Sequence, residues 1–149
     1  MFEHLLAALP AVVFSWQGVV AMVLATGAGI VIGALPGLSA TMGVALLIPF
    51  TFGMDPLTAL LAMAGMYNGA IYGGSIAAIL LNIPGTPAAV CTTLDGYPMA
   101  KRGEGVLALQ TAVVCSAVGG VISALALMFV APYLAKLALS FGPAAYFWV

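Results

Sequence analysis

Two short stretches hold the residues best suited to binding a solute. Residues 33–41 read "GALPGLSAT" and residues 82–90 read "NIPGTPAAV", and each places a Pro-Gly pair inside apolar sequence, with hydroxyl side chains just after it. A helix opened in hydrocarbon leaves N–H and C=O groups that cost several kcal/mol each unless protein or water satisfies them. The helix that follows such a break starts with free N–H groups and about half a positive charge, so it can bind an anion.

Paired breaks of this kind are typical of substrate sites in secondary transporters. The residues predicted to bind substrate are Gly37, Ser39 and Thr41 at the first break and Asn82, Pro84, Gly85 and Thr86 at the second. The alternative is that each Pro-Gly pair only turns the chain at the membrane surface. The repetition of small and hydroxyl residues favours the binding interpretation.

The segment "MYNGAIYGGS" adds two further candidates, Asn68 and Tyr72. Residues four apart share one face of a helix, so both side chains can reach the same ligand. Hydrogen bonds between neighbouring membrane helices are an equally good explanation of these polar groups.

The composition identifies an integral membrane protein. Hydrophobic residues make up 64% of the sequence and charged residues 5%, with a mean hydropathy of +1.24. Soluble domains carry about 25% charged residues, so this chain lacks the polar groups to cover a globular surface. The expected environment is a lipid bilayer.

Runs of apolar residues set the expected organisation, because about 20 of them cross a bilayer. We expect an all-α, polytopic transmembrane protein with broken or re-entrant helices. The predicted spans are residues 16–35, a partial span 39–53, 57–82 and 106–130, with a polar Pro/Gly loop at 83–105 and the start of a further helix at 143–149. Asp95, in "DGYP", is expected in a turn of that loop.

Small residues recur at every fourth position in two of these spans. One stripe is Ala25, Gly29, Gly33 and Gly37; the other is Gly65, Gly69, Gly73 and Ala77. In lipid, such stripes let helix backbones approach one another closely. Tight packing is the main interpretation of both stripes.

Several function classes find no support in the residues. The chain has one His, two Cys and three Lys or Arg residues. These do not form a catalytic set, a metal-ligand cluster or a basic patch for nucleic acid. We therefore expect no enzyme, no cofactor, no metal site and no nucleic-acid partner.

The longest motif carries a family resemblance. "GALPGLSAT", "YNGAIYGGSIAAILLNIPGTPAAVCTTLDGYPMAKRGEG" and "ALQTAVVCSAVGG" resemble the large membrane subunit of tripartite tricarboxylate transporters, the TctA type, from about Gly18 to the end of the chain. The resemblance implies a bacterial inner-membrane, multi-pass permease built from two related halves of opposite orientation. It also implies a small membrane subunit and a periplasmic solute-binding protein as partners, and import of citrate or other tri- or dicarboxylates. An ion gradient, of sodium or protons, would drive this symport in place of ATP.

The length of the chain adds an expectation about what it can do alone. The sequence covers only part of the first half of such an inverted-repeat transporter, so we expect a fragment that does not transport alone. The rival interpretation is a membrane scaffold or channel-like subunit that uses the breaks only for packing.

Lys101 and Arg102 predict the orientation of the chain, because the positive-inside tendency places their loop in the cytoplasm.

Overall fold

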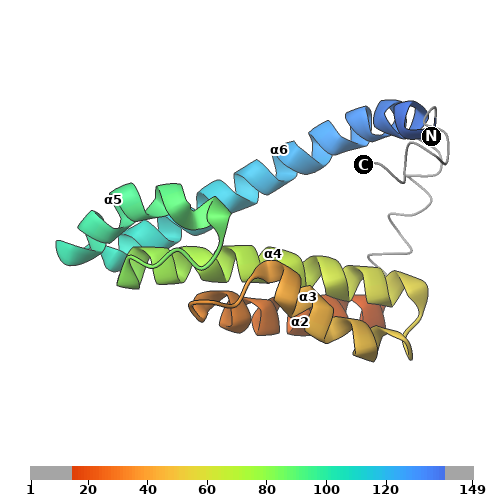
Figure 1. Ribbon diagram of the computed structural model, residues 1–149, viewed down its shortest axis with the longest axis horizontal. Coiled ribbons are helices and arrows are strands. Elements are labelled where there is room, and N and C mark those ends of the chain that lie inside the picture. The colour runs from red at the N-terminus through yellow and green to blue at the C-terminus, as the bar shows by residue number, and fades with distance from the viewer. Residues whose placement is uncertain (1–14, 140–149) are drawn as a thin grey trace. The chain divides into compact units, whose positions relative to one another are not determined.

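The computed structural model describes residues 15–139, with side chains to residue 134, and this part of the chain is helical without strands. Its elements are α2 (Trp16–Ala34), α3 (Ala40–Thr51), α4 (Pro56–Leu81), the 3₁₀ helix η1 (Pro87–Ala89), α5 (Val90–Lys101) and α6 (Gly105–Leu139) (Figure 1). The helix start predicted at 143–149 lies outside the described residues.

Three of these helices are long and apolar enough to cross a membrane: Trp16–Ala34, Pro56–Leu81 and Gly105–Leu134. Helix α3 is apolar but has only 12 residues. At 1.5 Å per residue it reaches about 18 Å, well short of a hydrocarbon core of about 30 Å. The protein is thus an all-α, polytopic membrane protein in which one apolar helix does not complete a crossing.

The chain divides into two compact units, residues 1–112 and 113–149. The first unit contains α2, α3, α4, η1 and α5, and it holds both Pro-Gly breaks.

Helices α2 and α4 form the centre of the unit through the two stripes of small residues. A Cβ atom added at Gly29 or Gly33 would overlap the carbonyl oxygens of Met66 and Ala70, and one added at Gly65 would lie 2.6 Å from the Met22 carbonyl oxygen. These contacts are between backbones, as the stripes predicted. Gly69 faces Thr26 and Gly73 faces Ile30. A contact further toward the C-terminus of α4 is thus also further toward the C-terminus of α2, so the two helices are parallel.

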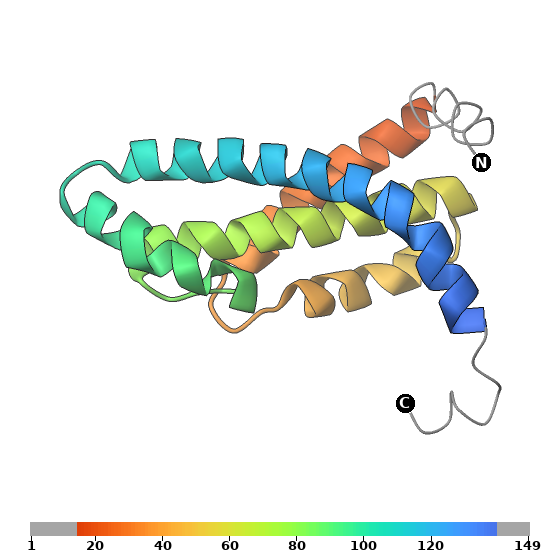
Figure 2. The same ribbon diagram turned by 90° about the horizontal axis from the view of Figure 1, so that it is seen from above.

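Helix α3 runs back beside this pair from the first break (Figures 1 and 2). Its N-cap is Ser39, whose Oγ accepts a hydrogen bond from the Met42 N–H at 3.2 Å. A Cβ added at Gly43 would lie 3.4 Å from the Met66 sulfur and 3.5 Å from Ile32. Met66 joins Ala25 and Ala62 in a small buried core, so α3 packs on the α2–α4 pair mainly through this cluster.

Helix α4 begins and ends with recognisable signals. Asp55 is the N-cap and accepts a hydrogen bond from the Thr58 N–H at 3.2 Å, with Pro56 at the first helical position. Ser, Thr, Asp and Asn are the favoured residues at this position because they satisfy an orphan donor. The helix ends at Asn82, which adopts the left-handed conformation with φ 59°.

The predicted polar loop at 83–105 is wrong for most of its length. Residues 87–101 are helical in η1 and α5, and Asp95 is an exposed residue of α5. The motif "DGYP" predicts a turn that includes Gly96, but a Cβ there would lie 2.7 Å from Ile79. The glycine is therefore used to bring α5 against α4, and the actual turn contains Gly103, with φ +87°.

Candidate functional site at the junction of the two breaks

The second break folds back along α4 after Asn82. The Ile83 N–H donates to the Ala77 carbonyl at 3.4 Å, and the Gly85 N–H donates to the Gly74 carbonyl at 3.5 Å. Gly74 lies eight positions before Asn82, which corresponds to about 12 Å along the helix axis. The helical segment that starts at Pro87 therefore begins beside the body of α4 and not beyond its end, as a re-entrant segment does.

Glycines allow this fold-back to come close to both long helices. A Cβ added at Gly85 would lie 2.5 Å from the Gly33 carbonyl oxygen and 2.9 Å from the Gly74 Cα. A Cβ added at Gly74 would lie 2.9 Å from the Oγ1 of Thr86. Gly33 is the penultimate residue of α2, just before the first break, so the structure brings the two broken segments together.

Two helices start near this junction. Helix α3 and the η1–α5 segment start at a similar level of α4 and run in opposite directions from it (Figures 1 and 2). Each start carries about half a positive charge from the aligned peptide dipoles. Two such ends that face a common region add their fields there, and this favours a negatively charged group between them.

Free donors are present at the first of these starts. The N–H groups of Ala40 and Thr41 donate to no acceptor within residues 15–139. The hydroxyls of Ser39 and Thr41 lie 2.7 Å apart and hydrogen-bond to each other. Thr41 and Gly37 are exposed, and Gly37 has φ +95°. The first start is therefore open at Thr41, whereas Ala40 beside it is buried.

The second start is more enclosed. Thr86 is the N-cap of η1 and is 6% exposed. Its Oγ1 is buried and has no hydrogen-bond partner among the described residues. Leaving a buried polar group unpaired costs about 1–3 kcal/mol, so such a group in a native fold needs an explanation. Pro84 and Asn82 are exposed at the rim of the same loop.

Asn68 and Tyr72 do not belong to this junction. At 100° per residue, Asn68 lies about 170° around α4 from the midpoint of Gly73 and Gly74, and Tyr72 about 150° from it. Asn68 is exposed, and its Nδ2 donates to the Ala64 carbonyl of the same helix at 3.0 Å. These two residues thus form part of a separate face of α4.

Gly33 and Gly74 were not predicted as site residues, although both shape the junction. Gly33 stands in the first small-residue stripe, and its spacing alone indicated only helix packing. Gly74 falls outside the second stripe and follows Gly73 directly. The pair of adjacent glycines could have indicated a second close contact on α4, because Gly73 faces α2 and Gly74 faces the fold-back.

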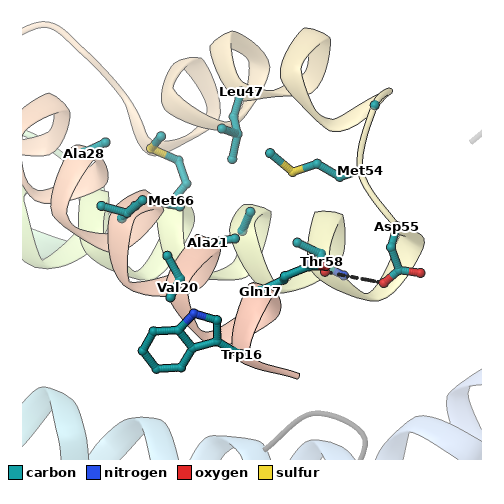
Figure 3. Close-up of a pocket in the computed structure, with 14 residues that line it drawn as sticks. Trp16, Gln17, Val20, Ala21, Ala28, Leu47, Met54, Asp55, Thr58 and Met66 are labelled. Carbon is teal, nitrogen blue, oxygen red and sulfur yellow. Dashed lines mark hydrogen bonds between the residues drawn. The ribbon is translucent and has the colours of Figure 1, made fainter. Parts of the chain in front are cut away.

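A separate apolar groove lies at the other end of the unit, where α2, α3 and α4 begin or end (Figure 3). Its volume is about 650 Å³. None of the predicted substrate-binding residues lines it. The described residues also contain no group of three or more His, Cys, Asp or Glu side chains arranged to hold a metal ion.

Paired broken segments that start helices beside a long membrane helix are typical of secondary transporters. Comparison with known proteins supplies the family. The model of the tripartite tricarboxylate transporter TctA family matches residues 19–149. The chain belongs to this family.

One curated relative is 44% identical over 119 residues, which is 80% of this chain and 24% of the relative. It is an uncharacterized 52.8 kDa protein in the TAR-I ttuC' 3' region of Agrobacterium vitis. The chain therefore spans about a quarter of the length of the relative it matches. No solved structure is significantly similar to the chain.

Proposed function

We propose that this chain is part of the permease subunit of a tripartite secondary transporter that imports tri- or dicarboxylates such as citrate across the bacterial inner membrane. Its partners are the small membrane subunit and the periplasmic solute-binding protein of the system. Sodium ions or protons drive uptake. Membership of the TctA family supports the transporter class.

The observation that carries the site is the packing of the second break against the end of α2 and the body of α4, through Gly33, Gly74 and Gly85. A carboxylate there would accept hydrogen bonds from the free Ala40 and Thr41 amides and from the hydroxyls of Ser39 and Thr86. Each charge-assisted hydrogen bond contributes about 1.5–3 kcal/mol. Two helix starts suit a solute with more than one carboxylate.

The absence of basic residues strengthens this assignment of roles. All three Lys and Arg residues of the chain, at positions 101, 102 and 136, follow both breaks in the sequence. Lys101 stacks over the Tyr97 ring at 4.8 Å, and Arg102 lies 3.7 Å from the Glu104 carboxylate. Peptide dipoles and neutral side-chain donors, hydroxyls and amides, are therefore the groups that residues 15–100 can offer to an anion.

A scaffold role for the same residues rests on the close packing around Gly85, which would stabilise the fold without any ligand. The two proposals differ in what Ser39 and Thr41 do. Neither hydroxyl holds the two breaks together, because their hydrogen bonds stay within residues 39–42.

Uptake of radiolabelled citrate tests the proposal in cells that express the complete permease gene with both partner subunits. We expect the T41V variant to lower uptake about tenfold at normal membrane abundance, which corresponds to loss of one hydrogen bond to a charged group. T111V is the control, since Thr111 is an exposed helical threonine outside both breaks, whose hydroxyl donates to the Leu107 carbonyl of its own helix. Unchanged uptake by T41V would favour the scaffold.

A further inference from the structure

The groove at the far end of the first unit has a graded lining. Its inner part is formed by apolar side chains that include Leu24, Ala28 and Met66. Its polar residues are confined to one end, where Gln17 lies in the first turn of α2 and Asp55 and Thr58 lie at the start of α4 (Figure 3). The lining thus suits an amphiphile with one long apolar portion and one polar end.

The length of the groove matches one leaflet of a bilayer. Its lining on α2 runs from Trp16 to Ala28, or about 18 Å at 1.5 Å per residue. Half of a 30 Å hydrocarbon core is about 15 Å. Trp16 stands at the polar end, where tryptophan is enriched at the membrane–water interface. The groove volume of about 650 Å³ falls within the usual range of about 300–1,000 Å³ for ligand sites.

The charge at the polar end is a carboxylate without a cation. Asp55 Oδ2 accepts from the Thr58 N–H at 3.2 Å and from the Thr58 hydroxyl at 3.4 Å, while Oδ1 has no partner among the described residues. Residues 15–100 contain no Lys, Arg or His. A donor that carries a positive charge would complete this end of the groove.

We propose that this groove binds a phospholipid whose headgroup carries a primary ammonium, as phosphatidylethanolamine does. One acyl chain lies along α2 and α4 to Ala28 and Met66, and the ammonium donates to the Asp55 carboxylate. A quaternary ammonium has no N–H to donate, and an anionic headgroup is repelled by Asp55. The groove therefore selects among headgroups, which ordinary lipid contact does not.

Native mass spectrometry of the full permease tests this binding. The protein is purified in detergent and exchanged into excess phosphatidylethanolamine, phosphatidylcholine or phosphatidylglycerol of equal chain length. We expect retained phosphatidylethanolamine only, and about tenfold less of it in D55N, because Asn keeps the N-cap but loses the charge. Equal retention of the three lipids, or unchanged retention by D55N, would overturn the proposal.

A second pair of variants separates lipid from protein as the occupant. A28F fills the inner end of the groove and should abolish retention, whereas V23F, on the same helix but outside the lining, should leave it unchanged. A photoreactive residue at position 28 should cross-link to lipid. A cross-link to another segment of the permease would show that protein fills the groove and would refute the lipid assignment.

Discussion

The two breaks share the letters Pro-Gly and use their glycines for different physical reasons. Gly37 adopts φ +95°, and a Cβ atom there would meet nothing within 4 Å. Gly85 has no such backbone constraint, but a Cβ there would lie 2.5 Å from one backbone atom and 2.9 Å from another. The first glycine is needed for conformation and the second for proximity.

This difference separates the roles of the two segments. The first break is an exposed turn that sets the direction of α3, and the Thr41 donors beside it are accessible to a ligand. The second break is held against α2 and α4 and has a buried hydroxyl. If the comparison holds, substitutions at the second break should disturb the whole junction, whereas those at the first should act locally.

The largest effect is expected at Gly85. G85A places a methyl group against the Gly33 carbonyl and the Gly74 Cα, and overpacking of this kind costs about 1–3 kcal/mol. We expect citrate uptake to be lost and the melting temperature in detergent to fall. G27A is the control, because a Cβ at Gly27 has open space. Normal uptake by G85A would show that the two breaks need not touch.

Thr86 should give opposite effects on stability and uptake. T86V removes the unpaired hydroxyl but keeps the shape, so the melting temperature should rise by the equivalent of about 1 kcal/mol. Uptake should fall about tenfold if the hydroxyl binds substrate, and T86S should restore it. A variant with raised stability and full uptake would assign Thr86 to packing alone.

Gly37 should respond to backbone conformation and not to side-chain size. An L-residue in the left-handed region costs about 1–2 kcal/mol, and Asn tolerates it better than Ala. We therefore expect G37A to lower the melting temperature and G37N to lower it less. An equal loss in both variants would indicate a contact that the described structure does not contain.

The smallest effect is expected at Ser39. S39A removes the N-cap of α3 and should destabilise the protein by about 0.5–2 kcal/mol, whereas S39D should retain the cap. Uptake by S39D distinguishes a capping role of Ser39 from a role in substrate binding, since an aspartate would repel a carboxylate substrate. A fully active S39D would exclude an anion near this helix start.

Much of the fold followed from periodicity. The composition and apolar runs predicted an all-α membrane protein, and the small-residue stripes predicted the close contact of α2 and α4. The loop at 83–105 was wrong because Pro, Gly and Asp were counted as turn residues. Proline is favoured in the first turn of a helix, as at Pro87, and Gly96 serves a close helix contact instead of a turn.

The candidate site was predictable in part. The two Pro-Gly pairs predicted the breaks, and the free N–H groups of the helices that follow predicted a binding role. The structure brings the two broken segments together at Gly33 and Gly85. The sequence could not indicate that the second break folds back by eight residues, because this depends on the hydrogen bond from Gly85 to Gly74. Asn68 and Tyr72 share a face of α4, and their spacing alone did not indicate that this face points away from the fold-back.

The contact between α2 and α4 limits how this subunit can move. Their main chains touch at successive turns through Gly29, Gly33, Gly65, Gly69 and Gly73. Neither helix can slide past the other without first lifting away by roughly the width of a methyl group, which would forfeit packing along the whole seam. We therefore expect α2 and α4 to move together as one unit, with any hinge in the shorter segments that pack on them.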